Sequence, residues 1–248
     1  MTPLQNPGAT RKHRPRPMYR LADGTRVPSV TAVLQIIAKP WLVPWANRLG
    51  LQGVDSAKYV EQTAVAGSLT HDWIEHKLTG RTWDSAQLAD YSEDEQGQAL
   101  RAYAGFRQWS RAHVLEPLLI ESALISEQLR IGGTIDLYAL LDERHALIDF
   151  KTSARVYDSH LVQLAAYRAL LEESGRQVDE VRVVVLPRDG SAWFEEVETD
   201  TSMYLDVFRA ARHLHEAHRV LDRERRRQQE QRTRERAAQR TETETRMQ

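Results

Sequence analysis

The sequence predicts an α/β protein in which a mixed central β-sheet is flanked by helices, with additional helices at its N-terminal end. Helical and strand-like segments alternate along the chain without a repeat of fixed period, which excludes a solenoid and favours one mixed domain. Three strand-like segments follow one another near the middle of the chain, and a helix then separates them from a β-branched run, VRVVVL. Because parallel strands need a crossover connection, we expect both parallel and antiparallel neighbours in the sheet.

The N-terminal part of the chain is predicted to be helical. Pro40 interrupts the first apolar stretch, and Gly80 ends the longest helical pattern. Ser92 and Glu95 have the spacing of a capping box, after which apolar residues recur at helical intervals. The predicted helices cover residues 29–38, 42–49, 57–78 and about 92–114.

Strand signals dominate from residue 118 onward. They consist of apolar or β-branched runs separated by short polar segments, and Gly175 ends the one helical pattern among them. The predicted strands cover residues 118–125, 133–141, 146–152, 181–186 and 192–197, with helices over 159–173 and from about 202.

Composition limits the class of protein. A chain of 248 residues with 41% hydrophobic content can bury one substantial core, and its net charge of −1 gives no overall attraction to polyanions. The absence of cysteine excludes disulfides, thiol nucleophiles, cysteine-ligated zinc and iron–sulfur clusters. No apolar run is long enough for a membrane span or a secretory signal, so the sequence predicts a soluble cytoplasmic protein without a membrane partner.

Both ends of the chain differ in composition from the middle. Residues 1–20 carry basic side chains among prolines and no acid, which predicts a flexible basic arm and opposes the amphipathic helix of a transit peptide. Residues 222–248 are highly charged and almost free of apolar residues, which predicts a charged helical extension or a disordered tail. The folded domain is therefore expected over residues 21–221.

An aspartate interrupts each of two neighbouring apolar strands, at Asp136 and Asp149. Strand residues alternate between faces, so a hairpin that turns at 143–144 places Lys151 directly opposite Asp136 and Asp149 on its diagonal, within about 5 to 8 Å at the Cβ atoms. The other face of the hairpin is apolar and is expected to form the core. It consists of Ile135, Leu137, Ala139, Leu141, Ala146, Ile148 and Phe150.

The charges on this face are unbalanced. Two carboxylates repel each other at this distance, and Lys151 neutralises only one of them. A divalent cation would restore the balance, and oxygen ligands favour Mg²⁺ or Mn²⁺. A solvated surface salt bridge is the alternative that the spacing alone leaves open.

Further residues resemble the motifs of the PD-(D/E)XK nuclease superfamily. Asp136 followed by Asp149-Phe150-Lys151 resembles its bipartite signature, although isoleucine stands where the family name has proline. Three more motifs, in the same order along the chain, resemble those of the RecB-type exonuclease branch, and segments 28–31 and 44–45 are similar to phage-type and mitochondrial genome maintenance exonucleases. The three motifs are Gly67-x₃-His71-x₃-Glu75, Gly133-x₂-Asp136 and Gln163-x₃-Tyr167.

This resemblance, which covers about residues 28–170, implies a restriction-endonuclease-like core and a set of functional residues. The metal ligands would be Asp136, Asp149, the Phe150 carbonyl oxygen and His71. The resemblance places Lys151 beside the attacking water. Metal coordination lowers the pKa of water, and a lysine can stabilise the charge that grows on the phosphate.

Helical spacing brings other motif residues onto shared faces. His71 and Glu75 are one turn apart, as are Gln163 and Tyr167, and these four join Asp136, Asp149 and Lys151 in the expected catalytic and metal-binding set. Ordinary packing is the alternative for each, and a zinc helix is disfavoured because HExxH is absent. Glu121 interrupts an apolar strand and is either a metal-side acid or an outward-facing residue.

The resemblance implies a metal-dependent DNA exonuclease of phage or bacterial recombination, repair or DNA processing, acting in the bacterial or phage-infected cytoplasm. Its substrate would be DNA that is single-stranded or has free ends, and Trp41 and Trp45 are candidates for stacking on unpaired bases. No GxxxxGK[ST] loop is present, so unwinding would require a helicase or recombination partner. A structure-specific endonuclease and a catalytically silent nucleic-acid-binding module are the alternatives.

Overall fold

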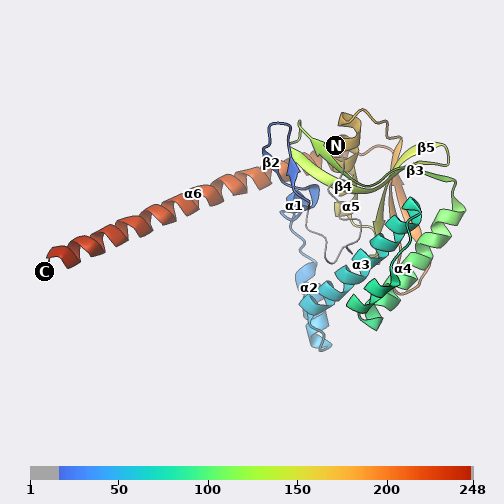
Figure 1. Cartoon of the computed structure of the whole chain (residues 1–248), viewed down its shortest axis with the longest axis horizontal. Helices are drawn as coiled ribbons and strands as arrows, with labels where there is room; N and C mark the ends of the chain where they lie inside the picture. The colour runs from blue at the N-terminus through green and yellow to red at the C-terminus, as the bar shows by residue number, and fades with distance from the viewer. Residues whose placement is uncertain (1–16, 247–248) are drawn as a thin grey trace.

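A mixed β-sheet forms the centre of the computed structural model, which describes residues 17–246, with side chains to residue 234 (Figure 1). Within these residues the sheet has the order β3-β4-β5-β6-β7, and only β5 and β6 are parallel. The crossover between them is α5, Asp158–Glu173, which confirms the predicted mixed sheet. The strands are β3 (Leu115–Ser126), β4 (Ile131–Leu141), β5 (Arg144–Lys151), β6 (Glu180–Val185) and β7 (Phe194–Glu198).

The helices follow the predicted order with small changes at their ends. Gly80 ends α3 in the left-handed conformation, with φ of +68°, and Ser92 and Glu95 form the predicted capping box of α4. A short 3₁₀ helix, Ser85–Asp90, was not expected from the sequence. The other helices are α1 (Val30–Leu34), α2 (Leu42–Leu51), α3 (Ser56–Thr79), α4 (Glu93–Ala112) and α6 (Ser202–Arg246), and β1 (Tyr19–Arg20) pairs with β2 (Arg26–Val27).

Helices cover the hairpin of β4 and β5 on both faces. One face packs against α4, where Phe106 and Trp109 meet the Phe150 ring in edge-to-face contacts. The other face packs against α5 and the first turns of α6, and it buries Tyr138 and Leu147. The prediction that one hairpin face forms the core while the other carries the chemistry is therefore wrong for most of the hairpin. The physical reason is that a central strand with a parallel neighbour has helices on each side.

The hairpin turn lies one residue earlier than the sequence predicted. Leu141 pairs with Arg144, and the intervening Asp142 and Glu143 have φ of +48° and +68°, as a type I′ turn requires. The Asp142 side chain accepts a hydrogen bond from the Val114 backbone N–H at 2.8 Å, which helps to hold this turn. Extending the observed register places Asp149, and not Lys151, at the position opposite Asp136. Because the pairing partner of Asp136 changes by two residues, which is one full period of side-chain alternation, the three side chains remain on the same face.

The N-terminal strands dock on β4 through a glycine. The Tyr19 ring lies so close to Gly132 that a Cβ atom there would be 2.1 Å from it, and the Tyr19 hydroxyl lies 2.9 Å from the Thr134 Oγ1 atom. Residues 1–16 of the expected basic arm lie outside the described residues, whereas Tyr19 and Arg20 form β1. Tyr19 and Arg20, which were expected to belong to the flexible arm, are therefore part of a strand.

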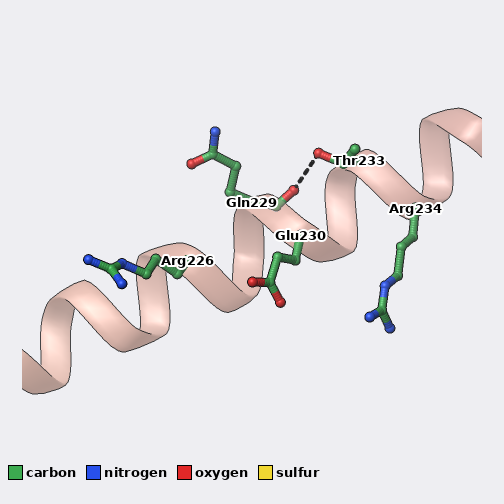
Figure 2. Close-up of a pocket in the computed structure, with 5 residues that line it drawn as sticks. All are labelled: Arg226, Gln229, Glu230, Thr233 and Arg234. Carbon is green, nitrogen blue, oxygen red and sulfur yellow. Dashed lines mark hydrogen bonds between the residues drawn. The ribbon is translucent and has the colours of Figure 1, made fainter.

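Within the described residues, the first turns of α6 pack against α5 and α1. Phe208 and Ala211 are buried there, and the rest of the helix extends away from the molecule (Figure 1). Figure 2 shows a hollow along this extension that is lined by α6 side chains alone, with the Thr233 hydroxyl donating to the Gln229 carbonyl oxygen at 2.9 Å. Because a single exposed helix forms this hollow, it has no opposing wall and is not suited to enclosing a ligand. None of the helices in residues 17–246 is long and apolar enough to cross a membrane.

Candidate active site

Strands β4 and β5 separate at the two interrupting aspartates. Their regular pairing ends at Leu137 and Ile148, and the Asp136 Oδ2 atom then accepts a hydrogen bond from the Phe150 N–H at 2.9 Å. A side-chain carboxylate thus satisfies a backbone donor of the neighbouring strand where the ladder has stopped. The separation leaves room between the strands for side chains from other elements.

Helix α3 brings an imidazole to this point. The His71 Nδ1 atom lies 3.5 Å from Asp136 Oδ2 and 4.0 Å from Glu121 Oε1. Each of these three residues offers one ligand atom, and the three atoms lie within 4.8 Å of one another. Gly67, one turn before His71, allows the close approach, because a Cβ atom there would be 3.0 Å from the Thr152 hydroxyl oxygen. The predicted Gly67 and His71 motif thus places an imidazole nitrogen beside Asp136.

Glu121 reaches the cluster through an unusual backbone conformation. Its φ is +44°, and its neighbours Ile120 and Ser122 pair with Leu137 and Ile135, so Glu121 faces Asp136 across the two strands. A left-handed residue other than glycine is uncommon and costs free energy, and such residues concentrate at functional sites. The side chain is only 7% exposed, which disagrees with the outward-facing alternative. The only sequence signal for Glu121 was that it interrupts an apolar strand.

Asp149 is buried and paired with the catalytic-motif lysine. The Lys151 Nζ atom lies 2.6 Å from Asp149 Oδ2, and the Asp149 residue is 2% exposed. Burial raises the pKa of Asp149 to about 6, and the nearby Asp136 charge adds to the rise, although Lys151 opposes both. Ionised Asp149 is therefore held at a cost that a second positive charge would relieve.

A chain of hydrogen bonds links Lys151 to α5. Its ammonium group donates to Gln163 Oε1 at 3.2 Å, and the Gln163 amide donates to the Tyr167 hydroxyl at 3.0 Å. Burial raises the pKa of Tyr167 above its usual value, so the phenol stays protonated. Gly133 makes room for this ring, because a Cβ atom there would be 2.4 Å from Tyr167 Cε1. Gly133 therefore makes room for Tyr167, Tyr167 supports Gln163, and Gln163 orients the Lys151 ammonium group.

Two other predicted residues have clear partners. The Glu75 carboxylate is 2% exposed and lies 2.6 Å from the Arg81 guanidinium group, one turn along α3 from His71. Glu75 is not one of the three residues with converging ligand atoms. The Phe150 ring packs in the core while its N–H contacts Asp136, so this residue fixes the separation of the strands.

The comparison with protein families decides the identity of this arrangement. A family model described as the PD-(D/E)XK nuclease superfamily matches residues 45–248, which is most of the chain. The chain belongs to this superfamily. The match confirms the resemblance at superfamily level and agrees with the restriction-endonuclease-like, helix-flanked mixed sheet. No curated protein matches the chain.

The donor atoms of this nuclease fit a divalent cation. Glu121 and Asp136 bring two carboxylates together beside His71, and the nearby Asp149, whose pKa the Asp136 charge raises, is paired with Lys151. Buried like charges are unfavourable unless a cation balances them, and carboxylate oxygens with an imidazole nitrogen suit a hard or borderline metal ion. PD-(D/E)XK nucleases use divalent metals, and His71, Glu121 and Asp136 form the group that would hold one here.

Replacing Glu121 with glutamine is expected to weaken Mn²⁺ binding about 10- to 100-fold, because a neutral amide cannot balance the cation. Isothermal titration calorimetry measures this change directly. Glu116 lies on the same strand but is exposed, so Glu116→Gln is the matched control and should bind Mn²⁺ like the wild type. Equal affinity of the Glu121→Gln protein and the wild type would show that this carboxylate is not a ligand.

Replacing Gly133 with alanine is expected to destabilise the protein by about 1–3 kcal/mol, because the methyl group must displace the Tyr167 ring. The displaced ring can no longer support Gln163, so cleavage should also fall about tenfold or more. Thermal unfolding and a cleavage assay measure the two effects. Gly50→Ala, where a Cβ atom meets nothing within 4 Å, should change neither. A normal melting temperature for Gly133→Ala would contradict this role of the glycine.

Proposed function

We propose that this nuclease is a Mg²⁺- or Mn²⁺-dependent deoxyribonuclease that removes nucleotides from DNA ends. The observation that carries the proposal is the group formed by buried Glu121 and half-buried His71 and Asp136 beside the Asp149–Lys151 pair. Acidic oxygen ligands favour these hard cations. Among known groups of the superfamily, the motif order resembles that of RecB-type exonucleases, which supports cleavage at ends.

The side chains have separate roles in this proposal. Asp136, Asp149, Glu121, His71 and the Phe150 carbonyl oxygen hold the metal, which when bound lowers the pKa of water and withdraws charge from the phosphate. Lys151 lies beside Asp149 and stabilises negative charge on the phosphate during hydrolysis. Gln163 and Tyr167 hold the ammonium group in position. Glu75 fixes the start of the following loop through Arg81.

Aromatic side chains near α5 support a substrate with unpaired bases. The Trp41 side chain is 43% exposed, and its ring is nearly parallel to that of Tyr157, with centroids 6.2 Å apart and an interplanar angle of 10°. The Arg155 guanidinium carbon lies 4.8 Å from the centre of the Tyr157 ring. Exposed rings beside a cation are suited to stacking with bases and to contact with a phosphate backbone.

The proposed setting is DNA recombination, repair or processing in the cytoplasm of a bacterial or phage-infected cell. Support comes from the similarity of residues 28–31 and 44–45 to phage-type exonucleases. A helicase or recombination protein would supply single-stranded ends, because the chain contains no phosphate-binding loop of the GxxxxGK[ST] type.

Digestion of labelled linear DNA and covalently closed circular DNA, each with Mg²⁺, Mn²⁺ or EDTA, tests the proposal. The expected result is metal-dependent loss of nucleotides from linear ends while closed circles stay intact. Cutting of circles would instead favour a structure-specific endonuclease. Binding without cutting in any metal would favour a catalytically silent module.

Metal binding should depend on pH through Asp149. Folding raises the pKa of Asp149 from 3.8 to about 6, so the fold favours the protonated carboxyl group. This contribution to the stability of the metal-free fold is fully present below the unfolded-state pKa of 3.8 and is lost as the pH rises through about 6. A cation must displace the Asp149 proton, so Mn²⁺ affinity should fall about tenfold per pH unit below about 6. Calorimetry at several pH values measures this. Equal affinity at about pH 5 and about pH 8 would contradict the assignment of Asp149 as a ligand.

A further inference from the structure

A second polar site lies beside the candidate active site. It is a pocket of about 290 Å³ at the end of β5, formed by Tyr59 of α3, Gln98 and Arg101 of α4, and loops 152–154 and 187–189. Thr152 follows Lys151 directly in the chain, and its hydroxyl oxygen lies against Gly67 on α3. The pocket therefore begins where the catalytic strand ends.

Arg188 supplies an unsatisfied donor to this pocket. Its Nη1 atom is buried and has no hydrogen-bond partner, and among the described side chains of residues 17–234 no carboxylate lies within ion-pair distance of its guanidinium group. Burial lowers the pKa of Arg188, which shows the cost of holding this charge away from water. A half-buried guanidinium group with a buried, unsatisfied N–H donor is unfavourable, and an incoming anion would remove the penalty.

The neighbouring groups make the pocket cationic and fix its shape. Arg101 Nε donates to the Arg188 carbonyl oxygen at 2.6 Å, which ties α4 to the loop that carries Arg188. Asp189 is the acidic residue of the lining, and its Oδ1 atom already accepts from the Ser191 N–H and hydroxyl groups at 2.9 and 2.7 Å. Two arginines against one engaged carboxylate leave a net positive charge. A guanidinium group matches the geometry of phosphate oxygens.

An aromatic surface borders the pocket on the α2 side. The Tyr59 ring lines the pocket and meets the Trp45 ring edge to face, with centroids 6.0 Å apart. Such rings can stack with a base whose phosphate occupies the pocket. A cationic pocket with an aromatic border is suited to a nucleotide unit of a polynucleotide strand more than to a simple carboxylate.

We propose that this pocket, centred on Arg188, holds a phosphate group of the nucleic acid adjacent to the one being hydrolysed. The proposal rests on the nuclease function proposed above. The phosphate is either a terminal 5′-phosphate or an internal phosphodiester, and both present the same oxygens to the guanidinium group. Occupancy by a terminal phosphate would give the enzyme its preference for ends.

The test compares the wild type with Arg188→Gln on linear DNA that carries a 5′-phosphate or a 5′-hydroxyl group. The variant should raise KM about tenfold or more, while kcat and Mn²⁺ affinity stay unchanged, because it removes a charged hydrogen bond to the phosphate and leaves the residues proposed to hold the metal intact. Loss of a preference for the 5′-phosphate in the variant would identify a terminal phosphate. An equal rise in KM for both ends would identify an internal one.

Further measurements distinguish failure of the pocket assignment from misfolding of the variant and from failure of the proposed nuclease function. Arg107→Gln on the exposed face of α4 should leave KM unchanged. If Arg188→Gln does not fold, Arg101→Gln, whose side chain is largely exposed, takes its place with the same expectation. If the wild type does not cut DNA, fluorescence anisotropy with the same oligonucleotides in EDTA still reports binding. If a folded variant has the same KM as the wild type, the pocket assignment is overturned. If the wild type does not cut DNA, an unchanged binding affinity of the folded variant overturns it in the same way.

Discussion

Replacing Asp136 with asparagine is expected to lower kcat for phosphodiester cleavage about 10³-fold or more, which corresponds to about 4 kcal/mol of lost transition-state stabilisation. The carboxylate lies 3.5 Å from His71 Nδ1 and belongs to the group of converging ligand atoms. An amide removes the negative charge that the cation requires. Its oxygen can still accept the hydrogen bond from the Phe150 N–H, so the separated strands should keep their arrangement.

Steady-state cleavage of linear DNA in Mn²⁺ measures this effect, with thermal unfolding as the check on the fold. Asp222→Asn is the matched control, because Asp222 lies on the exposed part of α6, and it should cleave like the wild type. A folded Asp136→Asn protein that keeps more than about one tenth of the wild-type kcat would be inconsistent with Asp136 as a metal ligand.

Replacing Lys151 with methionine is expected to lower kcat about 10²- to 10³-fold at saturating metal. The methionine removes the positive charge that would stabilise the phosphate. It also leaves Asp149, which is 2% exposed, without its ion-pair partner at 2.6 Å. The pKa of Asp149 should then rise further, so that more of this carboxyl group is protonated near neutral pH.

The same cleavage assay, repeated between about pH 6 and about pH 9, separates the two effects, because raising the pH restores ionised Asp149 but not the missing ammonium group. Lys77→Met on the exposed face of α3 serves as the control and should behave like the wild type. Full recovery of Lys151→Met at high pH would mean that the lysine acts only by keeping Asp149 ionised.

The sequence predicted the architecture because its local signals agree with the tertiary structure. The capping box at Ser92, the glycine at Gly80 and the β-branched run of β6 each indicate one element. The hairpin turn was predicted one residue too late, because Asp142 and Glu143 take left-handed conformations that neither residue type requires. The functional side chains stayed on one face because the pairing register changed by two residues, which preserves the alternation of side chains between faces.

Residues brought together by distant contacts were harder to predict. Glu121 enters the site through a left-handed backbone at +44°, and strand alternation alone gives no indication of this conformation. The roles of Gly67 and Gly133 were known only as motif positions, whereas the structure shows which neighbours, Thr152 and Tyr167, leave no room for a Cβ atom. Arg188 lies on a loop whose position depends on α4, so no local pattern marked it.

The carboxylates between the separated strands are expected to hold a divalent cation. A crystal of the wild-type protein grown with Mn²⁺, measured near the manganese absorption edge, locates the ion by its anomalous signal. We expect a peak in contact with Asp136 and His71, on the side of the hairpin that Asp149 and Glu121 face, and loss of this peak in Asp136→Asn. A manganese peak confined to other surfaces, with these four side chains unliganded, would contradict it.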